Sequence, residues 1–380
     1  MSKRGNNEGS VYQRPDGRWV AAITAGYTAA GRRQRRTALA ENKASARKRL
    51  AQLLADVEQG LSLAPTPTLA DYLRKWLKEA APRTLRPRTL AGYTSIVERH
   101  LIPALGRIRL RKLQPGDIDA YLNSATEAGL TPRTGQYHHA VLRRALGQGE
   151  RWGYVSRNVA RLVTPPQVRQ RDITPLTPEQ ARRFLVGIEG DGLEALYAVS
   201  LSLGLRQGEA LGLTWADLDL EGRSLTVRRS LQRYAGTYHL DPPKTQRSRR
   251  TISLPVPLVD ALRQHRARQA GERLRAGPLW EGERWNLVFC TERGEPLAGA
   301  QVTRRFQAKL AALGLPRQRF HDLRHAAATF LLAQGVPLRV VMEVLGHSTI
   351  TTTANVYGHV LPELARDAMD RQGALLFGTS

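Results

Sequence analysis

The chain has 380 residues, of which 41% are hydrophobic and 24% are charged, as in globular proteins of several domains. Lys and Arg number 58 against 33 Asp and Glu, and the formal net charge of +25 favours a polyanionic partner, above all nucleic acid, over a ribosome-associated or generally basic protein. The single cysteine, Cys290, excludes an internal disulfide and a zinc site built from several cysteines, and no apolar run reaches the ~18 residues of a membrane span.

The start of the chain, Met1–Ser10, is polar and has no hydrophobic signal core, so we expect a cytoplasmic protein with no membrane partner. Two proline-containing stretches, Ala64–Pro67 and Thr164–Pro175, are poor helix or strand sequence. We therefore expect domains at 1–63, 66–163 and 174–380. The predicted fold class is multidomain and mainly α with small β-sheets, and the surplus of basic residues is densest in the first two segments.

The first segment predicts a small three-stranded sheet and one helix. Asp16-Gly17 lies between two strand-like runs, which is typical of a β-hairpin. We expect a third strand over Arg33–Ala38 and a helix over Lys43–Glu58. The basic and aromatic residues of these strands are candidates for contact with a DNA groove, or form only a solvated face. They are Arg18, Trp19, Arg33, Arg35 and Arg36.

The second segment predicts four helices, because its apolar residues recur at i, i+3 and i+4. The first three cover 69–77, 90–97 and 115–128. The fourth begins at Thr131-Pro132, an N-cap followed by proline, and carries Tyr137, Val141, Leu142 and Leu146 on its apolar face. Basic residues on the outer faces are candidate DNA contacts, and the alternative is a helical linker domain with no ligand. They are Arg88, Arg133, Arg143 and Arg144.

The third segment predicts an α+β domain. Thr177-Pro178-Glu179-Gln180 is a capping box that begins a helix. The pattern then predicts a helix over 192–203, strands over 223–229 and 251–254, and helices over 256–269, 300–313, 321–334 and 337–345. Gly346 is expected to end the last of these. A further apolar stretch covers 361–376.

Four motifs of this segment lie in a fixed order. They are Gly204–Leu213 (GLRQGEALGL), Lys244–Pro255 (KTQRSRRTISLP), His321–His325 (HDLRH) and the stretch from Leu345-Gly346-His347 to Tyr357. The order of Arg206, Lys244, His321, Arg324, His347 and Tyr357 resembles the catalytic set of the tyrosine recombinase, or phage integrase, family, over most of 177–371. The resemblance implies an enzyme that cuts and rejoins DNA at specific sites.

The resemblance implies a role for each motif residue in attack on a scissile phosphate. Tyr357 is the nucleophile, which leaves a 3′-phosphotyrosine and a free 5′-hydroxyl. Arg206 and Arg324 clamp the non-bridging oxygens, since guanidinium forks match phosphate geometry. A phenol is protonated near neutral pH, so His321 assists proton movement at Tyr357.

Four further roles complete the predicted site. His347 hydrogen-bonds the phosphate. Lys244, placed on a β-hairpin turn after Asp241-Pro242-Pro243, protonates the leaving 5′-oxygen. Glu209, three residues after Arg206 on the same helical face, orients the site. His325 is as readily a packed histidine as a catalytic one.

We expect no cofactor. The two arginines and Lys244 supply the positive charge that a metal supplies in many phosphoryl transfers, so no metal ion is required. The sequence has no Gly-Lys-Ser/Thr phosphate loop, and the phosphotyrosine retains the bond energy for religation, so ATP is not expected.

The resemblance also implies the partners. Segment 66–163 is similar to the family's helical core-binding (SAM-like) domain, and segment 1–63 to the small domain that holds arm-type DNA sites. We expect a homo-tetramer on double-stranded DNA at attachment-type sites, with host bending or directionality factors, that integrates or excises a mobile element. The C-terminal stretch docks on a neighbouring protomer or on its own domain.

Three alternatives stay open at this point. The first is a resolvase or invertase of the same family, and the second is a catalytically silent DNA-binding regulator. The third, a type IB topoisomerase, ranks lower because the HDLRH and LGH motifs are typical of integrases.

Overall fold

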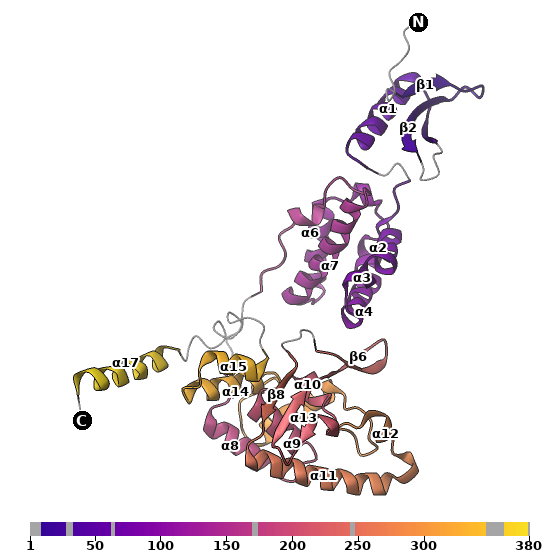
Figure 1. Ribbon diagram of the computed structural model, residues 1–380. Helices are drawn as coiled ribbons and strands as arrows, with labels where there is room; N and C mark the ends of the chain where they lie inside the picture. Colours follow the sequence, from indigo (N-terminus) through magenta and orange to yellow (C-terminus); the bar gives the residue numbers. More distant parts are fainter. Residues whose placement is uncertain are drawn as a thin grey trace. The chain divides into compact units, whose positions relative to one another are not determined.

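The computed structural model describes residues 9–27, 33–61, 65–168, 174–243, 248–346 and 361–378 (Figure 1). By internal contacts the chain separates into two compact units, Met1–Gln170 and Arg171–Ser380. The first two expected segments both fall in the first unit, so the division into three domains stays a prediction.

The first unit begins with an antiparallel sheet in the order β1-β2-β3. Its strands are β1 (Ser10–Gln13), β2 (Trp19–Tyr27) and β3 (Arg33–Ala40), followed by helix α1 (Lys43–Glu58), which packs on them (Figure 1). Gly17 adopts a positive φ of 80° in the hairpin turn, where the carboxylate of Asp16 accepts a hydrogen bond from the Arg18 N–H. The hairpin, third strand and helix are confirmed, although β3 continues past its predicted end at Ala38.

The rest of the first unit is helical. Its α-helices are α2 (Leu69–Glu79), α3 (Ala81–Thr84), α4 (Pro87–Ile96), α5 (Ile102–Leu105), α6 (Pro115–Glu127) and α7 (Pro132–Arg151). The prediction of four helices was too simple, because a π-helical turn, Val97–Leu101, joins α4 to α5. Val97, Leu101 and Leu105 are buried along this continuation, and Pro103 lies in the first turn of α5, which follows directly on the π-helical turn.

Helices α2 and α7 carry the centre of the bundle core. Leu69, Leu73 and Trp76 of α2 are buried, as are Val141 and Leu142 of α7. The hydroxyl of Tyr72 donates a 2.5 Å hydrogen bond to the Ala145 carbonyl. Tyr137 was wrongly placed on the apolar face: it is 44% exposed, and its ring lies at 71° to the ring of Tyr93, with the two centres 5.8 Å apart.

The second unit is a layer of helices around small sheets. Its helices are α8 (Pro178–Gly187), α9 (Glu194–Leu203), α10 (Gln207–Leu211), α11 (Val256–Ala276), α12 (Gly282–Trp285), α13 (Gly299–Ala312), α14 (Asp322–Ala333), α15 (Leu338–Leu345) and α17 (Leu361–Phe377). Strands β4 (Leu218–Asp219), β5 (Ser224–Val227) and β8 (Arg250–Ser253) form one antiparallel sheet, and β6 (Ser230–Tyr234) and β7 (Thr237–Asp241) form a hairpin.

The predicted elements of this unit are confirmed, with α11 ending later than expected. The sequence did not predict α12, β4 or the β6–β7 hairpin, and it indicated α10 only through the helical spacing of Arg206 and Glu209. The hairpin turns at Ala235-Gly236, with φ values of 50° and 82°, and so lacks the Asn-Gly or Asp-Gly signal of a two-residue turn.

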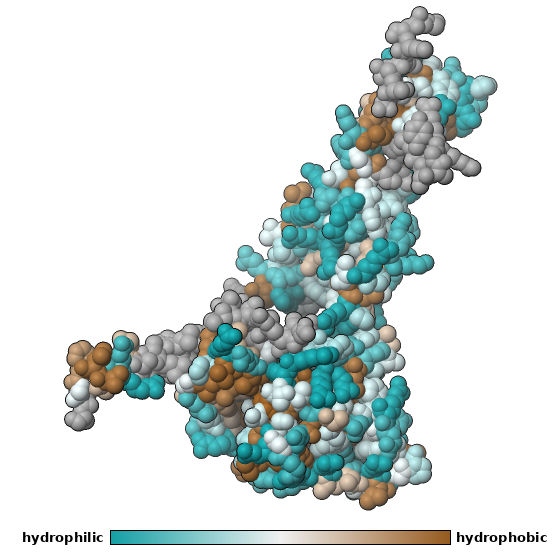
Figure 2. Space-filling model, in the orientation of Figure 1, coloured by the Kyte–Doolittle hydropathy of each residue, from teal (hydrophilic) through white to brown (hydrophobic). Residues whose placement is uncertain are grey.

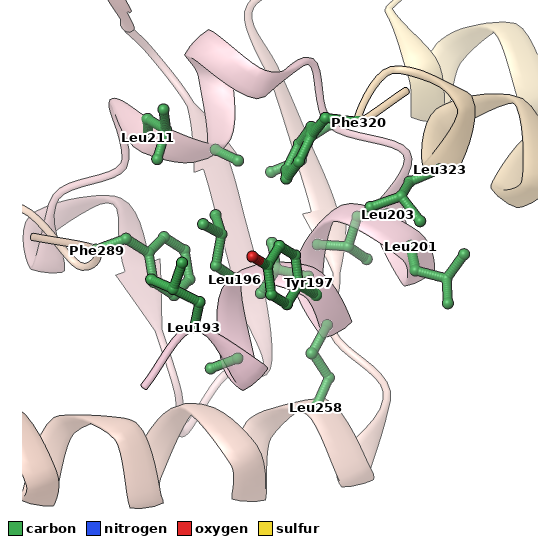
Figure 3. Packing of buried hydrophobic residues seen from close by; sticks show 14 of the residues in the cluster. Leu193, Leu196, Tyr197, Leu201, Leu203, Leu211, Leu258, Phe289, Phe320 and Leu323 are labelled. Atoms are coloured by element: carbon green, nitrogen blue, oxygen red, sulfur yellow. The ribbon is translucent and has the colours of Figure 1, made fainter. Parts of the chain in front are cut away.

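Helix α9 lies at the centre of this unit (Figure 3). Leu196 and Tyr197 are fully buried, and the apolar side chains around them come from several elements. Figure 3 labels, among these, Phe289, Phe320, Leu211 at the end of α10, and Leu323, which belongs to α14. Seven of the ten residues of α9 are buried, which fixes the position of its C-terminal end, where the first of the four motifs begins.

Among the residues that the structure describes, no helix is both long and apolar enough to cross a bilayer. Helix α17 nevertheless exposes apolar side chains, which Figure 2 shows gathered on the terminal helix. Met369, Leu375, Leu376 and Phe377 are between 64% and 84% exposed. Its docking on a neighbouring protomer or on its own domain stays a prediction.

Candidate active site

Arg206 is held at the junction of two helices. Helix α9 ends at Gly204, whose φ of 60° is left-handed, and a Cβ there would clash with the side chain of Leu345. Arg206 is the N-cap of α10 and has an extended backbone. The carboxylate of Glu209 accepts a 3.1 Å hydrogen bond from the backbone N–H of Arg206. Glu209, the third residue of α10, therefore caps this helix by bonding to the N-cap residue Arg206. Arg206 precedes the helix, which corrects the prediction that both residues share one helical face.

The carboxylate of Glu209 lies between two guanidinium groups. Its Oε1 is 2.7 Å from Arg206 Nη1, and its Oε2 is 3.1 Å from Arg250 Nη2. Burial would raise the pKa of Glu209, but the charges of Arg250 and Arg206 outweigh it and hold that pKa below its ordinary value. Glu209 is therefore ionised, and its side chain is only 4% exposed whereas that of Arg206 is 39% exposed.

Both arginines also reach the C-terminal end of α15. Arg206 Nη2 donates a 3.3 Å hydrogen bond to the Gly346 carbonyl, and Arg250 Nε donates a 2.5 Å bond to the Val344 carbonyl. Gly346 ends α15 with a left-handed φ of 68°, as predicted. The last carbonyls of a helix lack partners within it, so these bonds stabilise the turn that precedes His347.

The HDLRH motif begins helix α14. His321 is the N-cap, and the carboxylate of Asp322 binds the Arg319 guanidinium at 2.8 and 3.1 Å. Arg324 is 2% exposed and donates a 2.8 Å hydrogen bond from Nη1 to the Gly204 carbonyl. This bond joins α14 to the end of α9, so residues 120 positions apart in the sequence meet at the site.

His321 and His325 lie one turn apart with perpendicular rings whose centres are 5.1 Å apart. His321 lies at the solvent-exposed rim of the cluster. Partial loss of hydration, followed by the charges of His325 and Arg324, lowers the pKa of His321 to about 4. Burial likewise lowers the pKa of His325. A neutral imidazole at neutral pH is able to accept a proton.

The structure thus brings together Arg206, Glu209, His321, Arg324 and His325. Lys244 lies in 244–247, in the connection between β7 and β8, and His347 and Tyr357 lie in 347–360, all outside the described residues. Sequence reasoning missed Arg250, although it stands in the same motif as Lys244. Nothing local distinguishes it from the 50 arginines of the chain, because only its burial against Glu209 marks it.

Most of the candidate DNA contacts are exposed in the first unit. Arg18, Arg35, Arg36, Arg88, Arg133, Arg143 and Arg144 all face solvent. Trp19 is half-buried, and the Lys43 ammonium lies 5.6 Å from the centre of its ring. The side chain of Arg33 lies outside the described part. Exposure is compatible with phosphate contact, and the assignment of these residues to DNA stays a prediction.

Within the described residues, no group of three or more His, Cys, Asp or Glu side chains is arranged to hold a metal ion. The expectation of a reaction without metal or nucleotide cofactor stays a prediction.

Comparison with known proteins identifies the family. Residues 176–363 match the phage integrase family, and residues 68–125 match the phage integrase N-terminal SAM-like domain. An integrase of Streptomyces ambofaciens is 34% identical over 354 residues, which cover 90% of this chain and 89% of the relative. The chain belongs to the phage integrase family of tyrosine recombinases.

Other relatives of this recombinase cover most of its length. An integrase of Saccharopolyspora erythraea is 29% identical and covers 99% of the chain and 98% of the relative. The Tn1549 transposon integrase, solved with circular intermediate DNA, is 25% identical with a TM-score of 0.67 and covers 80% of this chain and 99% of that one. The fold class and the tyrosine-type site-specific recombinase activity predicted from the motifs are confirmed.

The fold likeness also extends to a more distant integrase. A lambda integrase dimer bound to a core site has a TM-score of 0.57 at 19% identity and covers 94% of this chain and 96% of that one. At this identity the match shows the shared fold.

Proposed function

We propose that this recombinase integrates, and in the reverse reaction excises, a phage or other mobile element at attachment-type sites in double-stranded DNA. One observation carries the proposal: Arg206, His321 and Arg324 come from distant parts of the chain to one cluster, which is bonded to the residue before His347. Such a cluster supplies fixed positive charge and a neutral imidazole, which a phosphoryl transfer without a metal needs.

The proposed step exchanges one phosphoester bond for another. The phenolic oxygen of Tyr357 attacks the scissile phosphorus, and its proton passes to His321. The bond between phosphorus and the 5′-oxygen breaks, and Lys244 protonates that oxygen. A 3′-phosphotyrosine and a free 5′-hydroxyl result, and attack by the 5′-hydroxyl of another strand reverses the step.

Arg206 and Arg324 hold the phosphate during this exchange. The exposed part of the Arg206 fork is available to two non-bridging oxygens while its Nη1 stays on Glu209. His347 adds a hydrogen bond to the same oxygens. These charges are in place before the reaction, so they stabilise the developing negative charge without reorganisation.

DNA binding and assembly complete the proposal. Residues 1–63 bind arm-type sites, 66–163 grip the core site, and 174–380 carry the chemistry. Each active site cuts one strand, so an exchange between two duplexes uses four protomers. Host bending or directionality factors determine the direction of this exchange. DNA is the substrate, so the reaction takes place in the cytoplasm.

Integration is favoured over the resolvase or invertase and over the silent regulator. The relatives from Streptomyces ambofaciens and Saccharopolyspora erythraea are both integrases. Loss of Tyr357, Arg206 or Arg324 would mark a silent DNA-binding regulator, and all three residues are present.

Covalent trapping tests the proposal. Nicked duplexes from the DNA that flanks the gene are incubated with wild-type protein, and adducts that resist SDS are mapped by mass spectrometry. We expect a nucleotide on Tyr357 and a released 5′-hydroxyl that polynucleotide kinase labels. Tight binding to these duplexes with no adduct would favour the silent regulator.

Lys244→Ala should slow strand cleavage by about 10²- to 10³-fold and leave DNA affinity nearly unchanged, because it removes one proton donor among many phosphate contacts. A 5′-bridging sulfur in the scissile bond should restore the rate, since a thiolate leaves without a proton. Cleavage rates are measured on both substrates. Equal slowing on both would contradict the leaving-group role.

DNA affinity should fall steeply with salt, because the chain carries a net charge of +25 and neutralises many phosphates. We expect a loss of about 10³-fold or more between about 50 and 200 mM salt. Fluorescence anisotropy on a labelled duplex gives the slope. A nearly flat dependence would rule out phosphate contacts as the main source of affinity.

A further inference from the structure

Arg250 is buried at the meeting point of three elements. It lies on β8, where it pairs with Val227 of β5, and its side chain is 7% exposed. Its guanidinium donates to Glu209 Oε2 at 3.1 Å, to the Val344 carbonyl at 2.5 Å and to the Ser248 carbonyl at 3.1 Å. All three nitrogens of this guanidinium donate to protein acceptors, so any role it has in catalysis passes through these partners.

The same guanidinium lies directly against Gly346. A Cβ at this glycine would come within 2.8 Å of Arg250 Nη1. Together with the bond to Val344, this contact fixes the end of α15, which β8 packs against (Figure 1). His347 is the next residue along the chain, so Arg250 determines where the backbone enters the catalytic stretch.

Charge gives Arg250 a second effect. Arg206 and Glu209 alone form a neutral pair, and a buried carboxylate that binds one arginine lowers that arginine's attraction for a phosphate. Arg250 adds a positive charge on the opposite carboxylate oxygen, 3.1 Å away. The three groups together carry a net charge of +1, and the exposed member of the set is Arg206.

We propose that Arg250 is a positioning residue for DNA cleavage: it compensates the charge of Glu209, so that Arg206 keeps its positive charge for the scissile phosphate, and it holds the end of α15 before His347. The proposal rests on the function proposed above. It assigns no contact between Arg250 and DNA.

The test measures both the rate and the amplitude of adduct formation on a nicked duplex at saturating protein. The amplitude reports the folded fraction, and the rate reports the chemistry. Arg250→Met should lower the rate by about 10²-fold, as loss of one preorganised charge does, with DNA affinity within about twofold. Arg250→Lys keeps the charge but not the fork, so its rate should lie between those of Met and wild type.

The double variant Glu209→Gln/Arg250→Met separates charge compensation from packing. It removes both buried charges and leaves Arg206 with its own, so we expect the rate to recover about tenfold over Arg250→Met. Arg263→Met, which removes an exposed arginine that pairs with Glu221 at 2.7 Å, is the matched control and should behave as wild type.

The outcomes separate the two proposals. Wild-type cleavage with an unchanged rate for Arg250→Met overturns the role of Arg250 alone, and so does a double variant no faster than Arg250→Met. No adduct with wild type overturns the proposed function and this inference together. Loss of amplitude with an unchanged rate would show that Arg250 serves folding and not catalysis.

Discussion

Tyr357→Phe should abolish the covalent adduct completely and leave DNA affinity within about twofold of wild type. The change removes one oxygen, and that oxygen forms the new phosphoester bond, so no neighbouring group replaces it. DNA affinity comes from many phosphate contacts and depends little on one phenol. Denaturing gels on nicked duplexes measure the adduct, and anisotropy at the same salt measures the affinity.

Tyr197→Phe is the matched control for this experiment. Tyr197 is fully buried in α9, and among the described residues its hydroxyl has no hydrogen-bond partner. Its loss should leave cleavage unchanged and not lower the stability of the protein. Adduct formation by Tyr357→Phe at the wild-type rate would show that another of the 11 tyrosines is the nucleophile.

Arg206→Lys should lower the cleavage rate at saturating DNA by about 10²-fold or more, the second largest effect that we expect. Lysine keeps the positive charge but has no planar fork, so it cannot bind Glu209, the Gly346 carbonyl and two phosphate oxygens together. Single-turnover rates on nicked duplexes measure the loss. Thermal unfolding shows whether the variant is folded.

The control is Arg263→Lys, the same change at an exposed ion pair on α11, which should cleave like wild type. If Arg206→Lys affected DNA affinity as much as the cleavage rate, Arg206 would be an ordinary backbone contact. A wild-type rate would remove Arg206 from the reaction altogether.

Many of the individual elements could be predicted from the sequence, because their signals are local. Thr177 caps α8, Gly346 ends α15 and the turn at Asp16-Gly17 joins β1 to β2, each through a bond within a few residues. The prediction failed where the signal was weak, as at the Ala235-Gly236 turn, or where burial continued a helix, as from Val97 to Leu105.

The catalytic residue types and their order also follow from the sequence alone, since the HDLRH and LGH motifs need no structure to be read. They predicted a tyrosine recombinase, and the family comparison confirms it. The charge of +25 points to DNA in the same way, because net charge is a sum that does not depend on the fold.

Only the tertiary structure decided how these residues meet. Arg324 reaches Gly204 across 120 positions, and Arg206 reaches Gly346 across 140. In the sequence nothing distinguishes Arg250 from the other arginines among the 50. In the structure it is distinguished because the packing of β8 against α15 buries it beside Glu209. A capping residue bonds to neighbours in the chain, so its signal is local. A buried charge is compensated by a group that the fold brings near, and no local sequence pattern shows which group that is.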